Sequence, residues 1–132
     1  MKKIIPLFLF ALLFTACVST GANRVKVGHI LVTCPPDAPK NVVIKKWRRL
    51  KSAEMALKQK VTSFGQMAQE MSDCPTKDDG GLIGWINLDD PETAEKFPTQ
   101  FLQVAGSLEV GQMSEVIRTK FGFHLIKSYG KE

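Results

Sequence analysis

The sequence has few side chains that could support metal or nucleophilic chemistry. It contains only two histidines, His29 and His124, and three cysteines, Cys17, Cys34 and Cys74. The spacing of these residues matches no zinc-ligand pattern. No oxyanion-hole motif or cysteine protease signature surrounds Cys74, which argues against a nucleophilic cysteine–histidine pair. We therefore expect neither a metal nor a cofactor.

The sequence also lacks a strong charge of one sign. Its formal net charge is +5. Without the first sixteen residues the chain keeps 16 basic and 13 acidic residues, which is a charge of +3. This excess is too small to indicate a nucleic-acid-binding protein. There is no internal repeat and no low-complexity tract, and the length of 132 residues suits a single domain.

Only one long apolar run is present, at the start of the chain. The uncharged segment Ile4 to Ala16 follows two lysines, is too short to span a bilayer and is built like a secretory signal. Its end, Leu13-Phe14-Thr15-Ala16-Cys17, resembles the bacterial lipoprotein processing site, although Phe14 replaces the usual leucine. We expect lipid on the sulfur and amine of Cys17, and two acylated positions would make a stable anchor. The alternative is an ordinary cleaved signal that leaves a free, soluble protein.

These features divide the chain into three parts. Residues 1–16 are predicted to be the lipoprotein signal peptide, 17–24 the lipidated cysteine with a short tether, and 25–132 the folded domain. The six small or polar residues of the tether, VSTGAN, reach at most about 20 Å. The predicted location is therefore the cell envelope, with the domain held close to a membrane and facing the periplasm or the cell surface.

Both histidines fall on predicted strands. Val25 to Thr33 alternates as a strand, and His29 shares a face with its apolar residues. Gly111 to Lys127 reads as a β-hairpin, and its histidine, His124, lies on a face with Ile126. Two histidines on apolar strand faces can be neighbours in one sheet. The alternative for each is a core histidine that a backbone carbonyl satisfies.

The two remaining cysteines are not expected to form a disulfide. Cys34 lies an odd number of residues after His29, so it takes the opposite face if the strand continues, about 16 Å along it. This position argues against a bond to Cys74. About 116 residues are also enough to form a core without a disulfide.

A long amphipathic helix is predicted after the proline-rich turn at residues 34–41. Its apolar residues recur at spacings of three and four: Val43, Trp47, Leu50, Ala53, Leu57 and Val61. The other side carries a basic run: Lys45, Lys46, Arg48, Arg49 and Lys51. We interpret this run as a solvated helix face, and contact with an anionic membrane is the alternative.

The rest of the chain predicts shorter elements. A second helix begins at Ser63 with a capping box to Gln66. Leu82 to Ile86 is a short strand, and the acidic segment Asn87 to Glu95 is predicted to be a loop. A last helix follows Pro98. The predicted order is strand, helix, helix, strand, helix, strand, strand, with a small mixed or antiparallel sheet.

Three motifs taken together carry a family resemblance. They are Gly28-His29-Ile30-Leu31-Val32, then Ser72-Asp73-Cys74-Pro75 followed by paired glycines, and Thr119-Lys120-Phe121-Gly122-Phe123-His124. In this order and spacing the chain resembles the parvulin-type peptidyl-prolyl cis/trans isomerases over about Val25 to Lys127. The resemblance implies an α+β fold in which about four helices surround four antiparallel strands, in a βα3βαβ2-type order.

The resemblance also implies a groove for a proline-containing segment. His29, Cys74, Thr119 and His124 would form its polar floor as a hydrogen-bond network, with Cys74 as the polar or polarising member. Phe101 would be the aromatic wall and Ile83 the aliphatic wall. Phe97 and Phe121 would also contact the substrate, although Phe97 replaces the family's usual methionine and so reshapes the pocket.

The implied reaction is rotation about Xaa-Pro bonds of unfolded or exported polypeptides by a monomeric enzyme. No bond is made or broken, because the barrier of about 18 to 20 kcal/mol comes from amide conjugation. An apolar pocket that excludes water disfavours the polar planar amide. The rival function is a catalytically silent, parvulin-like chaperone that only binds extended chains.

Two hypotheses concern substrate preference. The loop after the first strand offers only Lys40, so we expect no dependence on phosphorylated substrates. The acidic segment Asn87 to Glu95 suggests a preference for basic residues beside the proline, and a solvated loop tip is the alternative.

Overall fold

The computed structural model describes residues 23–132, and the predicted signal peptide and Cys17 lie outside the described residues. Nine elements follow one another: β1 (Arg24–Thr33), α1 (Lys40–Lys58), α2 (Phe64–Met71), the 3-10 helix η1 (Pro75–Asp79), β2 (Leu82–Asn87), α3 (Pro91–Lys96), α4 (Thr99–Ser107), β3 (Ile117–Thr119) and β4 (Gly122–Lys131). The strands form one antiparallel sheet in the order β2-β1-β4-β3. The predicted four-stranded antiparallel sheet with four α-helices is confirmed. In the described part of the chain, no helix has both the length and the apolarity to cross a membrane.

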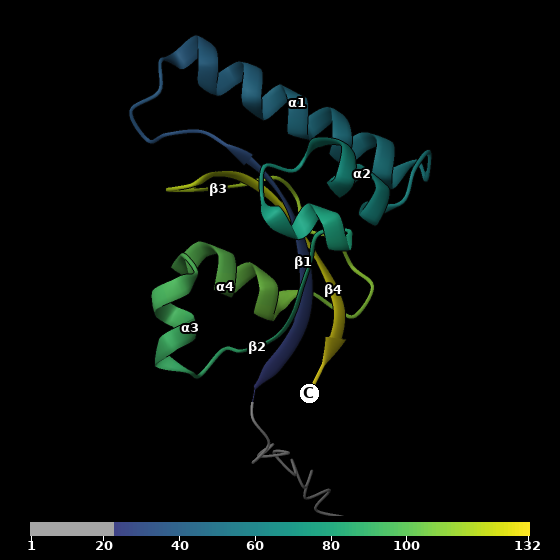
Figure 1. Ribbon diagram of the computed structural model, residues 1–132, viewed down its shortest axis with the longest axis vertical. Helices are drawn as coiled ribbons and strands as arrows, with labels where there is room; N and C mark the ends of the chain where they lie inside the picture. The colour runs from purple at the N-terminus through teal and green to yellow at the C-terminus, as the bar shows by residue number, and fades with distance from the viewer. Residues whose placement is uncertain (1–22) are drawn as a thin grey trace, which may run out of the picture.

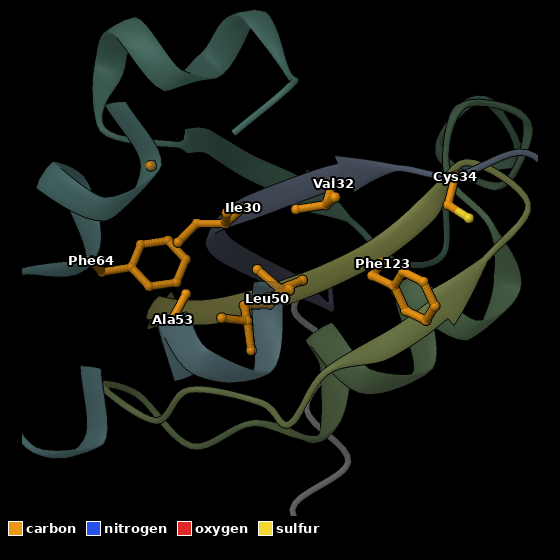
Figure 2. Close-up of a cluster of buried hydrophobic side chains, with 9 residues drawn as sticks. Ile30, Val32, Cys34, Leu50, Ala53, Phe64 and Phe123 are labelled. Carbon is orange, nitrogen blue, oxygen red and sulfur yellow. The ribbon is translucent and has the colours of Figure 1, made fainter. Parts of the chain in front are cut away.

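The two central strands bury both of their faces. On one face Ile30 and Val32 of β1 join Leu125 of β4 in a core that α1 and α2 cover (Figure 2). On the other face Val25 and Val27 join Ile126 in a core with α4. Figure 1 shows α1 and α2 on one side of the sheet and α4 on the other. The alternation predicted for both strands is therefore confirmed, and the two faces can serve different purposes.

The helix α1 differs in part from its predicted apolar stripe. Leu50 and Ala53 are buried as expected, but Trp47 is 42% exposed. Val61 is 73% exposed because α1 ends at Lys58 and leaves it outside the helix. The stripe instead includes Glu54, which is fully buried and pairs with the ammonium groups of two flanking lysines.

The predicted loop at Asn87 to Glu95 is wrong, because it contains the helix α3. Asp90 is its N-cap, and the carboxylate accepts a hydrogen bond of 3.0 Å from the Glu92 N–H. Pro91 occupies the first turn, where its fixed φ suits a helix. The sequence Asp90-Pro91-Glu92 therefore starts a helix, although its acidic residues and proline are also typical of a loop. The connection between β2 and β3 consequently contains two helices, α3 and α4.

Two glycines permit close backbone approaches that fix the histidine-bearing strands. The His29 N–H donates to the Gly81 carbonyl at 2.9 Å, and a Cβ on Gly81 would lie 2.5 Å from the His29 carbonyl oxygen. Gly122 has φ +144°, and a Cβ there would meet the Val32 carbonyl oxygen at 2.1 Å. Larger residues at either position would push β1 away from its neighbours.

Candidate active site

A cavity of about 230 Å³ opens on the face of the sheet that α4 covers. Its lining residues come from β1, the end of α3, the start of α4 and the β3–β4 hairpin: His29, Leu31, Lys96, Phe97, Pro98, Phe101, Phe121 and His124. Five of the eight predicted site residues, His29, His124 and the three phenylalanines, therefore meet here. Segments that are distant in sequence thus form one site.

The floor of the cavity is a pair of imidazoles. His29 on β1 and His124 on β4 lie on the same sheet face, and their Nδ1 atoms are 3.2 Å apart. Their rings stack with centroids 5.4 Å apart and an interplanar angle of 27°. Because two Nδ1 atoms share this hydrogen bond, one must carry the proton and the other must accept it.

Thr119 extends this network from β3. Its hydroxyl lies 2.7 Å from Nε2 of His124, and it also accepts a hydrogen bond from the Phe121 N–H at 3.2 Å. Thr119 is buried and does not line the cavity. It therefore supports His124 from below, as a positioning residue would.

Burial keeps both imidazoles neutral at pH 7. It lowers the pKa of His29 to about 4, because the charged form would lose its hydration. The same cause, followed by repulsion from His29, lowers the pKa of His124 to about 3. The floor is therefore a hydrogen-bonding surface without charge. Within residues 23–132, Nε2 of His29 is buried and has no hydrogen-bond partner.

Aromatic rings form the wall above the floor. Phe101 is 1% exposed, and its ring meets both imidazoles edge-on, with centroids 5.6 Å from His29 and 5.5 Å from His124. Phe97 stacks on Phe101 at 5.2 Å. Pro98, which lies between these two phenylalanines in the sequence, is the N-cap residue of α4. Phe121 lies at the tip of the β3–β4 hairpin and is 46% exposed. This arrangement provides apolar surface at the size of a proline ring.

Besides Thr119, two predicted site residues, Cys74 and Ile83, do not line the cavity. Cys74 is half-buried at the N-cap of η1, and its N–H donates to Ser72 Oγ at 3.3 Å. The N–H of the preceding residue, Asp73, donates to the carbonyl of Leu31 at 2.7 Å. Cys74 is therefore one residue away from a hydrogen bond to a residue that lines the cavity. Ile83 packs against the core that contains Phe101. Their functional roles stay predictions.

Leu31, Pro98 and Lys96 were not among the predicted site residues. Leu31 could have been found, because alternation places it on the face of His29. Lys96 is the one charged residue in the lining of this cavity. The sequence carries no signal for it, because Lys96 directly follows the segment Asn87 to Glu95, which predicted an acidic loop and not a helix that ends at the cavity.

A family model matches residues 29–129 and is described as Rotamase: PPIC-type PPIASE domain. The foldase protein PrsA of Clostridium botulinum (strain 657 / Type Ba4) is 36% identical over 111 residues, which cover 83% of this chain and 28% of that relative. The chaperone SurA of Methylobacillus flagellatus is 31% identical over 108 residues, which are 80% of this chain and 22% of that relative. This chain thus spans about a quarter of the length of these relatives.

Solved structures have the same fold. A PpiC-type peptidyl-prolyl cis-trans isomerase domain superposes with a TM-score of 0.71 at 24% identity, over 85% of this chain and 94% of that one. PrsA from Bacillus anthracis gives a TM-score of 0.65 at 25% identity, over 84% of this chain and 43% of that one. The resemblance seen in the sequence motifs is confirmed by these matches. The chain belongs to the PPIC-type, or parvulin, family of peptidyl-prolyl cis/trans isomerase domains.

Proposed function

We propose that this domain isomerises Xaa-Pro bonds of exported polypeptides in the cavity above His29 and His124. The observation that carries the proposal is an apolar cavity whose floor consists of two neutral, hydrogen-bonded imidazoles under Phe101. A proline ring would pack against Phe101 and Phe97, with Phe121 closing the side. Family membership supports the same reaction.

The proposed mechanism is non-covalent. Amide conjugation creates a barrier of about 18 to 20 kcal/mol, and the twisted transition state is less polar than the planar amide. The ring-lined cavity excludes water and so favours the twisted state. Nε2 of His29 is buried and has no hydrogen-bond partner among the described residues, so a bound segment would have to open the floor slightly to reach it. Thr119 would fix the tautomer of His124, and Cys74 would polarise the site from the start of η1.

A matched pair of variants tests the cavity. Phe101→Leu in the full chain removes the aromatic wall, and Phe64→Leu removes a comparably buried ring on the opposite face of the sheet. We expect the first to lower kcat/KM for an Xaa-Pro peptide by about tenfold, which is about 1.4 kcal/mol of transition-state binding. The second should stay within about twofold at temperatures where both are folded. Equal losses would refute the assignment.

A second candidate function is peptide holding without catalysis, which the names foldase and chaperone of the two relatives favour. The two functions separate in one pair of assays. If a proline peptide isomerises no faster than in buffer while the chain still suppresses aggregation of an unfolded client, holding is the function. Faster isomerisation that is lost in Phe101→Leu supports the enzyme.

We also propose that Cys17 is lipidated and anchors the domain in the cell envelope as a monomer. The support is the sequence around Cys17 and the apolar run before it. Mass spectrometry of the protein from membranes should find a chain that begins at Cys17 and carries lipid on both the sulfur and the amine of that residue. A chain that begins elsewhere and carries no lipid would contradict this.

A further inference from the structure

A larger cavity, of about 440 Å³, lies on the opposite side of the sheet from the histidines. The end of α1, the start of α2 and the segment before β3 form its walls, and β4 contributes Lys127. Lys127 lies three residues after His124 on β4, and an odd spacing along a strand places the two side chains on opposite faces of the sheet. This second cavity is therefore separate from the cavity above His29 and His124, which we name the proline cavity.

This cavity combines an apolar floor with a cationic rim. The floor comes from Leu57, Phe64 and Met113, all of which belong to the core beneath α1 (Figure 2 shows Phe64 beside this core). The rim carries three lysines, Lys58, Lys60 and Lys127, and no acidic residue lines the cavity. Lys58 is paired with Glu54 at 3.3 Å, whereas Lys60 and Lys127 form no ion pair within residues 23–132.

The backbone at Lys60 ends α1 in a Schellman motif, because the Lys60 N–H donates to the Leu57 carbonyl and the Val61 N–H to the Ala56 carbonyl, both at 3.1 Å. Lys60 has φ +56°, and it is the one non-glycine residue with positive φ in the described chain. The left-handed conformation after a helix normally selects glycine or asparagine, because a Cβ is strained there. Lys60 occupies this position and lines the cavity.

The basic residues of the neighbouring helix α1 add to the positive charge at the rim of the cavity. The helix α1 contains seven basic residues and one acidic residue, and that acidic residue, Glu54, is fully buried. Its exposed surface is therefore cationic along its whole length. Exposed apolar side chains adjoin the cavity in sequence, namely Val61, which is 73% exposed, and Val110, which is 59% exposed.

We propose that this cavity, which we name the lysine-rimmed cavity, binds acidic polypeptide segments that also carry apolar side chains. Charge complementarity selects glutamate and aspartate, and the floor of Leu57, Phe64 and Met113 accepts apolar side chains between them. A hollow with an apolar floor suits side chains of an extended chain better than the flat surface of a bilayer. The site would capture a client on the face opposite to the proline cavity, so that one polypeptide can use both.

The test uses the full chain and a labelled, proline-free peptide in which glutamate alternates with leucine. Matched peptides carry glutamine or lysine in place of glutamate, and fluorescence anisotropy measures binding. We expect the glutamate peptide to bind, with a Kd that rises with salt, and the lysine peptide to fail. A short proline peptide should not compete, because its cavity lies on the other face of the sheet.

Two double variants remove equal charge at different places. Lys60→Gly with Lys127→Gln should weaken binding of the glutamate peptide by about fivefold or more and leave kcat/KM for a proline peptide unchanged. Lys45→Gln with Arg49→Gln, on α1 outside the cavity, should weaken it by about twofold at most. Lys60→Gly alone should keep or raise the Tm, because glycine relieves the positive φ, so weaker binding in this single variant cannot reflect unfolding.

Three outcomes would overturn the proposal. The first is equal weakening by both double variants, which would indicate a general charge effect. The second is unchanged affinity in Lys60→Gly with Lys127→Gln. The third is binding to phosphatidylglycerol vesicles, lost in that same variant, without binding to the glutamate peptide, which would assign the lysines to a lipid surface.

Discussion

At the scale of single residues, the floor of the proline cavity depends on the pairing of both ring nitrogens of His124. Its Nδ1 faces His29 and its Nε2 faces the Thr119 hydroxyl. All three side chains are buried, so an unpaired atom would not be rescued by water. The geometry of the imidazoles is therefore as sensitive to Thr119 as to the histidines themselves.

Thr119→Val keeps the shape of the side chain and removes the hydroxyl. We expect it to lower the free energy of unfolding by about 1 to 3 kcal/mol, because Nε2 of His124 and the Phe121 N–H lose a buried partner. Urea denaturation measures this loss. Thr119→Ser retains the hydroxyl and should recover most of the stability and of kcat/KM. If valine and serine behave alike, the hydroxyl is not what holds His124.

Residue patterns predicted part of the site. Alternation placed each histidine on an apolar face of its own strand, because strand geometry repeats every two residues, and the pairing of β1 with β4 brings the two faces together. The position of the Cys74 thiol depends on the turn into η1, and no periodicity describes that turn. Lys96 lines the cavity because α3 ends beside it, and the residues Asn87 to Glu95 before it did not indicate a helix.

At the scale of elements, the short helix α3 controls one side of the proline cavity. It has six residues, and its end delivers Lys96 and then Phe97 to the lining. A helix this short is marginal without its cap. Asp90, which was expected to act as an acidic loop residue, is instead a structural residue of the site. The preference for basic residues beside the proline stays a prediction, because no carboxylate lines the cavity itself but Glu95 lines an adjoining cavity with Phe97 and Pro98.

Asp90→Ala should lower the free energy of unfolding by about 1 kcal/mol, because the Glu92 N–H loses its acceptor. Fraying of α3 should also displace Phe97, so we expect KM for a proline peptide to rise more than kcat falls. Asp89→Ala is the control, because the neighbouring Asp89 side chain forms no hydrogen bond or ion pair within residues 23–132. Equal effects of the two variants would contradict the cap.

The elements themselves were largely predictable from sequence. Strands β1 and β4 and helix α2 followed from alternation, apolar spacing and the Ser63 cap, whose hydroxyl accepts from the Gln66 N–H. The buried glutamate of α1 was not predictable, because its stability depends on two lysines reaching over it. Tertiary contacts of this kind are not encoded in helical periodicity.

At the scale of the whole molecule, the two buried histidines make stability depend on pH. Their folded pKa values, about 4 and about 3, lie below the unfolded value of about 6.5. Between these values the unfolded chain binds more protons, so the free energy of unfolding falls as the pH falls. The stability is complete above pH 6.5 and is lost toward pH 4.

From pH 7 to pH 5 each histidine should remove about 2 kcal/mol from the free energy of unfolding. Urea denaturation at several pH values measures the slope. The double variant His29→Leu with His124→Leu should flatten it, because an apolar pair of similar volume does not titrate. A wild-type curve that stays flat over this range would mean that the imidazoles are not buried in the neutral form.

The first and last described parts of the chain are tied together at one end of the sheet. Arg24 and Glu132 exchange backbone hydrogen bonds of 3.2 and 2.8 Å, and their side chains form an ion pair at 3.0 Å. Figure 1 shows the start of β1 and the C-terminus at this same end. A polypeptide fused before Arg24 and another fused after Glu132 would thus depart from adjacent points. Such a unit can be inserted into a host protein at a single point of its chain.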